Sequence, residues 1–232
     1  KITAGYLFDS GALDSFKTYI TDHGLDDFIS AVILDQNSFP NLEKYDYIFV
    51  IDTPQVFEQL KKAKNVFVEC HTHYIENRQY LRRIPTQIKG IIVPSKSFKD
   101  LIQSEFPKLP PISVLPNPVP MAFFDVDSIH IESAFDKRII TYFGRLDELK
   151  NFNEAFKIFE GFVDNETLMY AVVGNGATQK DILRRLADEK MLRKSLIREN
   201  IGFDDVPYLI KLVKQHRGVY LSPSKGESFG LS

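Results

Sequence analysis

Short runs of apolar residues alternate with segments of helical spacing along nearly the whole chain. In the first half, Pro54 fits the first turn of a helix that turns Phe57 and Leu60 inward, and either Ser95 or Ser97 fits the cap of another helix. The apolar runs around these helices have the length of strands. The strands predicted for this half are 2–8, 28–34, 47–51, 66–68, 91–93 and 112–115.

The same alternation restarts at residue 139 and continues toward the end of the chain. Its first predicted helix carries one apolar stripe, made of Phe152, Ala155, Phe156, Phe159 and Phe162. The predicted helices are 152–163, 178–188 and 206–215, and the predicted strands are 139–143, 168–173, 196–201 and 219–221. Strands that alternate with helices predict an α/β fold whose parallel sheets are covered on both faces.

A proline-rich segment separates the two halves. It reads Leu115-Pro-Asn-Pro-Val-Pro120, and a polar, weakly patterned stretch follows it to about residue 137. Proline extends neither a helix nor a central strand, so this segment predicts a domain junction. We expect an N-terminal domain at 1–120, a linker at 121–137 and a C-terminal domain at 138–232.

Composition narrows the classes of function. The chain has 232 residues and a net charge of −2, so no positive field favours a nucleic-acid partner. Its single cysteine, Cys70, excludes an internal disulfide and fits a reducing compartment, which predicts a cytoplasmic protein. No apolar run approaches the roughly 18 residues of a membrane span. The first residue is Lys rather than Met and the last falls in a helix opening, so we expect both ends to be cut.

The loop after the predicted strand 139–143 is rich in phosphate-binding chemistry. Gly144 allows a tight turn at the strand end, and Arg145 and Lys150 follow within reach of one anion. A guanidinium binds phosphate through two parallel hydrogen bonds and an ammonium adds a point charge, so the pair suits a diphosphate. The alternative is a solvated loop in which Asp147 and Glu148 neutralise the two cations.

Two further loops follow other predicted strands. Gly174-Asn175-Gly176 permits a close backbone approach to a ligand, although a plain strand-to-helix turn explains it equally well. The dinucleotide fingerprint is absent, because Gln179 stands where it requires a third glycine. In the last loop, Glu227 precedes a predicted helix start whose N–H groups suit a phosphate, and the acid suits sugar hydroxyls. The alternative is a capped surface helix with an incidental acid. Parallel strands would bring all three loops to one sheet edge.

Four motifs occur in an order that resembles a known family. They are Gly-Arg-Leu-x-x-x-Lys-Asn, Val-Val-Gly-Asn-Gly, Asn-Ile-Gly-Phe and Leu-Ser-Pro-Ser-x-x-Glu-Ser-Phe-Gly-Leu. Together they resemble the retaining glycosyltransferases of family 4. The resemblance implies a GT-B fold, with two Rossmann-like parallel-sheet domains that face each other across a cleft, the second domain being incomplete. The family's second glutamate would fall three residues beyond position 232, so we expect a truncated chain with doubtful activity of its own.

The resemblance also implies roles for individual residues. The residues matching Arg145 and Lys150, at the turn of Gly144, hold the donor diphosphate, and the acid matching Glu227 holds hydroxyls of the donor sugar. The backbone that approaches sugar and phosphate matches Ser228, Phe229, Gly230 and Leu231. The segments that meet the nucleotide match Gly174, Asn175, Gly176, Asn200, Ile201 and Gly202. No metal and no cofactor are expected, because the two cations neutralise the phosphates.

In the first half, the segment Glu69-Cys-His-Thr-His-Tyr74 follows the predicted strand 66–68. Members of the family carry a histidine here that reaches the donor sugar, and His71 is the nearer match with His73 in reserve. A satisfied or exposed histidine is the alternative, and no carboxylate or cysteine cluster completes a metal site. A basic stretch follows, with Tyr74, Tyr80 and Leu81 nearby: Arg78, Arg82, Arg83, Lys89, Lys96 and Lys99. We favour a solvated helix face over peripheral contact with anionic lipid at the inner face of a membrane.

The resemblance implies transfer of a sugar from a nucleotide-diphosphate donor, expected to be UDP-linked, to a hydroxyl of a glycan, lipid-linked or other acceptor. Configuration would be retained, as in a hexosyltransferase of polysaccharide or glycolipid synthesis. Three rivals remain open. One is a phosphorylase or epimerase on the same scaffold, and another is a non-catalytic partner subunit. A nicotinamide oxidoreductase is disfavoured by Gln179 and by the lack of a clear ribose-binding acid.

Overall fold

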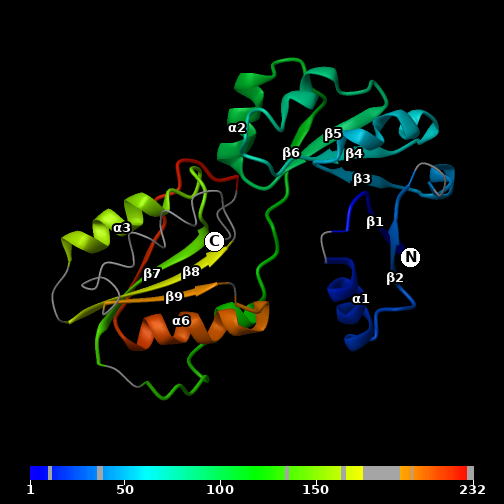
Figure 1. The fold of residues 1–232 in the computed structure, drawn as a ribbon. Helices are drawn as coiled ribbons and strands as arrows, with labels where there is room; N and C mark the ends of the chain where they lie inside the picture. Colours follow the sequence, from blue (N-terminus) through cyan, green and yellow to red (C-terminus); the bar gives the residue numbers. More distant parts are fainter. Residues whose placement is uncertain are drawn as a thin grey trace.

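The computed structural model describes residues 1–9, 12–35, 39–133, 136–162, 166–174, 194–199 and 201–228 (Figure 1). All strand pairs formed by these residues are parallel, as the alternation of strands and helices predicts. The fold is α/β. The predicted helix 178–188 and the candidate residues Asn175, Gly176, Asn200, Phe229, Gly230 and Leu231 lie outside the described residues.

The main sheet of the first half has the strand order β3-β4-β5-β6. Its strands are β3 (Ile48–Ile51), β4 (Val66–Glu69), β5 (Ile88–Val93) and β6 (Ile112–Val114). Two 3₁₀ segments, η2 (Pro54–Lys62) and η3 (Gln79–Arg83), and the helix α2 (Lys96–Glu105) connect them. Ser95 caps α2 by accepting the Phe98 N–H at 3.2 Å, which decides between the two predicted caps. Leu60 of η2 is buried as predicted.

The first two strands form a sheet of their own. β1 (Ile2–Tyr6) pairs with β2 (Ile29–Ile33), and α1 (Ala12–Asp22) joins them. Alternating apolar and helical patterns predict parallel strands but do not say which strands share a sheet, so the sequence did not reveal this division of the first half.

The sheet of the second half has the order β10-β7-β8-β9, with α3 (Phe152–Gly161) and α6 (Val206–Gln215) on its opposite sides (Figure 1). The strands are β7 (Arg138–Arg145), β8 (Thr167–Gly174), β9 (Ser195–Glu199) and β10 (Val219–Leu221). Since they are parallel, the loops after β7, β8 and β10 meet at one edge. Four residues of the predicted apolar stripe are buried, but Phe162 is 59% exposed because α3 ends one residue before it.

The segment between β6 and β7 contains the predicted linker. Its later part lies along α6, where the Lys214 ammonium binds the Asp127 carboxylate at 2.7 Å and the Lys211 ammonium donates to the Asp127 carbonyl at 3.2 Å. Farther along, His216 Nδ1 lies 2.9 Å from the Lys137 carbonyl oxygen. This part of the segment is therefore fastened to the second half.

Candidate functional site

Two of the predicted donor-binding residues are in direct contact. The Lys150 ammonium, on the loop after β7, donates to Glu227 Oε1 at 2.6 Å, on the loop after β10. Their side chains are only 13% and 29% exposed, so the pair is partly withdrawn from water. A partly buried cation and anion stabilise each other more than an exposed pair does. The two loops therefore meet at the carboxyl edge of the sheet, as the sequence predicts.

Asp147 organises the loop after β7. Its Oδ2 atom lies 3.0 Å from Arg145 Nε, and its Oδ1 atom accepts the Lys150 N–H at 2.8 Å. This ion pair is the one proposed by the solvated-loop alternative. The Arg145 side chain nevertheless remains 55% exposed, so Asp147 orients a guanidinium that a ligand can still reach. From the sequence, Asp147 was expected only to neutralise a nearby cation.

Backbone contacts fix the two loops to each other. The Lys225 N–H donates to the Leu149 carbonyl at 2.8 Å, and the Asn151 side-chain amide donates to the Pro223 carbonyl at 3.2 Å. Asn151 has a φ of 51°, in the left-handed region that asparagine tolerates better than most residues. The Lys150–Glu227 contact therefore rests on a supported backbone and not on side chains alone.

Gly144 lies within β7, paired with Val173, and not at the turn that the sequence predicts, because the strand continues to Arg145. A Cβ at this residue would lie 3.0 Å from the Tyr142 hydroxyl oxygen and 3.5 Å from Lys150 Cδ. The Tyr142 hydroxyl also donates to the Arg145 carbonyl at 2.9 Å, and burial is the main reason that its pKa is raised. A larger residue at 144 would displace the support of both Arg145 and Lys150.

His73, from the first half, reaches the loop after β10. Its imidazole lies so close to Gly226 that any Cβ there would overlap the ring. His73 Nδ1 is buried and has no hydrogen-bond partner among the described residues. Burial, followed by the positive charge of Arg78, lowers the pKa of His73, while Glu227 acts in the opposite direction. The lowered pKa favours the uncharged form of this ring beside the loop after β10.

His71 remains within the first half. Its Nε2 atom lies 3.2 Å from Glu69 Oε2, and its N–H donates to Asp52 Oδ2 at 2.9 Å. The sequence ranked His71 above His73 as the residue that reaches the second half, but the geometry reverses this order. The two positions differ because Asp52 holds the backbone at His71, whereas His73 lies two residues farther along the loop.

Two more contacts join the halves. The Tyr74 hydroxyl donates to Asp147 Oδ2 at 3.1 Å, and burial followed by the Asp147 charge raises the pKa of Tyr74. The Ser95 hydroxyl donates to the Ser228 carbonyl at 2.6 Å. In Figure 1, the loop after β10 accordingly runs beside the start of α2. The sequence did not assign Ser95 or Gly226 to this boundary, because neither pattern nor spacing indicates contacts 133 residues apart.

Arg78 corrects the prediction of an exposed basic face. Its side chain is 3% exposed and forms two hydrogen bonds with Glu105, at 2.7 Å and 2.6 Å. The guanidinium also donates to the carbonyl of His73. A buried guanidinium requires such partners, so Arg78 is an internal crosslink and not a lipid-binding side chain.

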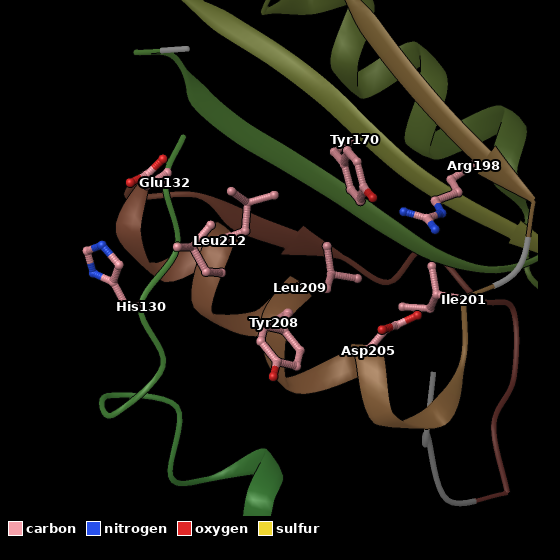
Figure 2. Close-up of a pocket in the computed structure, with 10 residues that line it drawn as sticks. His130, Glu132, Tyr170, Arg198, Ile201, Asp205, Tyr208, Leu209 and Leu212 are labelled. Carbon is pink, nitrogen blue, oxygen red and sulfur yellow. The ribbon is translucent and has the colours of Figure 1, made fainter. Parts of the chain in front are cut away.

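Ile201, a predicted nucleotide-binding residue, lines a cavity of about 430 Å³ on the α6 side of the sheet (Figure 2). Tyr170 of β8 and Arg198 of β9 line it as well, with Asp205 at its rim. The cavity shares no lining residue with the Lys150–Glu227 contact. Gly202 follows Ile201, and Gly174 ends β8 opposite Arg145 in the strand register.

Within the described part of the chain, no group of three His, Cys, Asp or Glu side chains is arranged to hold a metal ion. Among the same residues, none of the helices has the length and apolar character needed to cross a bilayer.

The second half is similar to a known family. The model of the family described as glycosyl transferases group 1 matches residues 125–232, which include β7 to β10. No match to the chain was found among curated proteins. The family match covers the loops that carry Arg145, Lys150 and Glu227.

Solved structures of glycosyltransferases have the same fold. Sucrose-phosphate synthase from Thermosynechococcus elongatus superposes with a TM-score of 0.59 at 17% identity, over 95% of this chain and 55% of that one. The lipopolysaccharide outer core galactosyltransferase WaaB superposes with a TM-score of 0.53 at 13% identity, over 99% of this chain and 75% of that one. The pneumococcal O-GlcNAc transferase GtfA, in complex with UDP and GlcNAc, superposes with a TM-score of 0.51 at 16% identity. The superposition covers 95% of this chain and 42% of that one. The fold is therefore GT-B, and the chain spans about half the length of the synthase.

Proposed function

We propose that the protein transfers a sugar from a nucleotide-diphosphate donor, UDP-linked, to an acceptor hydroxyl with retention of configuration. The observation that carries this proposal is the 2.6 Å contact between Lys150 and Glu227 at the carboxyl edge of a parallel sheet. A cation suited to phosphate and an acid suited to sugar hydroxyls lie side by side there, as a nucleotide sugar requires. The family match over residues 125–232 supports the same class of reaction.

On donor binding, Lys150 and Glu227 would release each other and bind the donor instead. In the free protein, Lys150 and Glu227 satisfy each other. When the donor binds, the ammonium turns to the diphosphate and the carboxylate accepts hydrogen bonds from the sugar. Arg145, at the end of β7, adds a second cation for the phosphates. Both charges are already partly withdrawn from water, so the exchange requires little further desolvation.

The main catalytic task is to stabilise the departing diphosphate. As the glycosidic bond breaks, negative charge grows on the phosphate oxygens, and Arg145 and Lys150 lie on one loop to receive it. The leaving phosphate takes the acceptor's proton on the same face of the sugar, so no side chain is needed as a general base. His73, held neutral beside Gly226, is the first-half group placed to contact the sugar.

The acceptor belongs to the first half in this proposal. It is a hydroxyl of a glycan, polysaccharide or glycolipid, and the reaction takes place in the cytoplasm, where nucleotide sugars would be available to it.

The test uses the full-length protein and a panel of UDP, GDP and ADP sugars. Saturation-transfer NMR measures binding, and NMR of the product's anomeric proton measures transfer and configuration. We expect binding of a UDP sugar and a product with the donor's configuration. Lys150→Ala should abolish measurable binding, whereas Lys225→Ala, an exposed lysine of the loop after β10, should leave it unchanged.

Three results would contradict the proposal. An inverted product excludes the retaining mechanism. Turnover that requires inorganic phosphate, or that changes the donor sugar without transfer, indicates a phosphorylase or an epimerase. Donor binding without any turnover indicates a non-catalytic subunit of the same fold.

A further inference from the structure

The Arg78 guanidinium divides its hydrogen bonds between two elements. Nε and Nη2 face both carboxylate oxygens of Glu105 at the end of α2, and Nη1 faces the carbonyls of Thr72 and His73. Backbone carbonyls in a loop have no partner from secondary structure, so a buried cation that donates to them fixes the path of the loop. The loop in question carries His73 to the other half of the molecule.

Phe98 holds the side chain of the same histidine. The Phe98 ring stacks against the His73 ring, with centroids 5.9 Å apart and planes at 30°. The Arg78 guanidinium carbon lies 5.8 Å from the centroid of the same Phe98 ring. Arg78 thus holds the carbonyl of His73, and Phe98 stacks on its ring. The same ring also lies against Gly226.

We propose that Arg78 and Glu105 are positioning residues for His73, which hold its imidazole against the loop after β10. The catalytic consequence of this arrangement rests on the function proposed above. The placement and ionisation of His73 do not, so they can be measured whether or not a substrate is known.

The charges around His73 give the proposal a distinctive signature. Arg78, from the segment before η3, lowers the pKa of His73, whereas Glu105 of α2 and Glu227 of the loop after β10 raise it. Among the described residues, these are the charges that shift the pKa of the ring. Removing the cation and removing the Glu105 charge must therefore move the pKa of His73 in opposite directions.

The experiment is an NMR titration of the histidine ring nitrogens in the full-length protein, with His73 assigned by its loss in His73→Gln. We expect Arg78→Met to raise the pKa of His73 and Glu105→Gln to lower it further. Arg82→Met is the matched control, because Arg82 lies over Phe106 and bonds to Gln79, away from His73. It should leave the titration unchanged.

A merely structural role predicts a different result. If the ion pair only stabilises the fold, both single variants loosen the packing and shift the pKa of His73 the same way, toward 6.5. Shifts in the same direction, or no shift, would overturn the proposal. Should the single variants fail to fold, Arg78→Met/Glu105→Gln removes both charges together. It should abolish the nuclear Overhauser contact between His73 and Gly226, and persistence of this contact would also overturn the proposal.

Activity gives a second, separable readout. Arg78→Lys keeps the charge but not the two-pronged hydrogen bonding, so the pKa of His73 should stay low while kcat falls about tenfold through misplacement of the ring. If no nucleotide sugar supports turnover but the opposite pKa shifts are observed, the proposed function fails and the positioning role stands.

Discussion

The two sides of the boundary between the halves are built differently. On the first-half side, the loop after β4 is held by internal partners, with the half-buried Asp52 at one end and the buried Arg78 at the other. On the second-half side, Arg145 pairs with Asp147 nearby, Lys150 and Glu227 pair across two loops, and all three side chains remain partly exposed. The first side is therefore a fixed wall, and in the proposed function the charges of the second side exchange partners with the donor.

Arg145→Ala should have a large effect on turnover and little effect on stability. We expect turnover of the full-length protein to fall roughly a hundredfold or more, because one preorganised cation facing the leaving group is lost. Stability should change by less than about 0.5 kcal/mol, since the Arg145 side chain is largely exposed. Arg138→Ala, at the opposite end of β7, is the control and should retain turnover. Near-normal turnover of Arg145→Ala would remove this residue from the site.

Asp52→Ala should have the opposite profile. The Asp52 carboxylate accepts the His71 N–H at 2.9 Å and the Tyr80 hydroxyl at 3.0 Å, and its φ is 44°. Loss of these bonds should lower the free energy of unfolding by about 2 kcal/mol, as measured in urea. Asp52→Asn keeps an acceptor and tolerates the left-handed backbone, so it should lose about half as much. Equal stability of Asp52→Ala and the parent protein would contradict the fixed-wall interpretation.

Gly226→Ala tests the contact between the sides. The new methyl group would overlap the His73 ring, so the loop after β10 must shift and turnover should fall about tenfold. Gly161→Ala is the matched change, because a Cβ at Gly161 meets nothing within 4 Å. The double variant His73→Ala/Gly226→Ala removes the clash, and its effect should be smaller than the sum of the single effects. Additive losses would mean that the ring does not press on this loop.

The smallest expected effect is the contribution of His73 to the pH dependence of stability. The pKa of His73 is lowered from 6.5, mainly by burial, so near that pH the unfolded chain binds a proton that the native ring does not. The stability contributed by the neutral ring is therefore complete above pH 6.5 and is lost as the pH falls toward the lower native pKa. The free energy of unfolding, measured in urea, should fall more steeply between about pH 7.5 and pH 5 for the parent protein than for His73→Gln. Parallel curves would contradict a buried neutral His73.

Regular elements were predicted well where periodicity alone defines them. The bounds of α6 and β10 agree with the predicted 206–215 and 219–221. The meeting of Lys150 and Glu227 followed from the parallel order, because parallel strands bring their terminal loops to one edge. In these regions local spacing and topology contain the necessary information.

Contacts between distant segments could not be predicted. Arg78 looked like a surface cation, because its partner Glu105 lies 27 residues away on another element. The choice between His71 and His73 depended on Asp52, which holds the loop from a neighbouring strand. Both predictions depended on the tertiary partners of polar groups, and hydrophobic periodicity does not indicate these partners.

The two hydrogen bonds described between the halves are made by groups that each have a second partner. Ser95 also accepts the Phe98 N–H of α2, and Asp147 also accepts the Lys150 N–H. Separation of the halves would thus replace two hydrogen bonds, of about 1 kcal/mol each, with bonds to water, and it would unfold no helix or strand. We therefore expect the two halves to be able to move apart while each keeps its own hydrogen bonds.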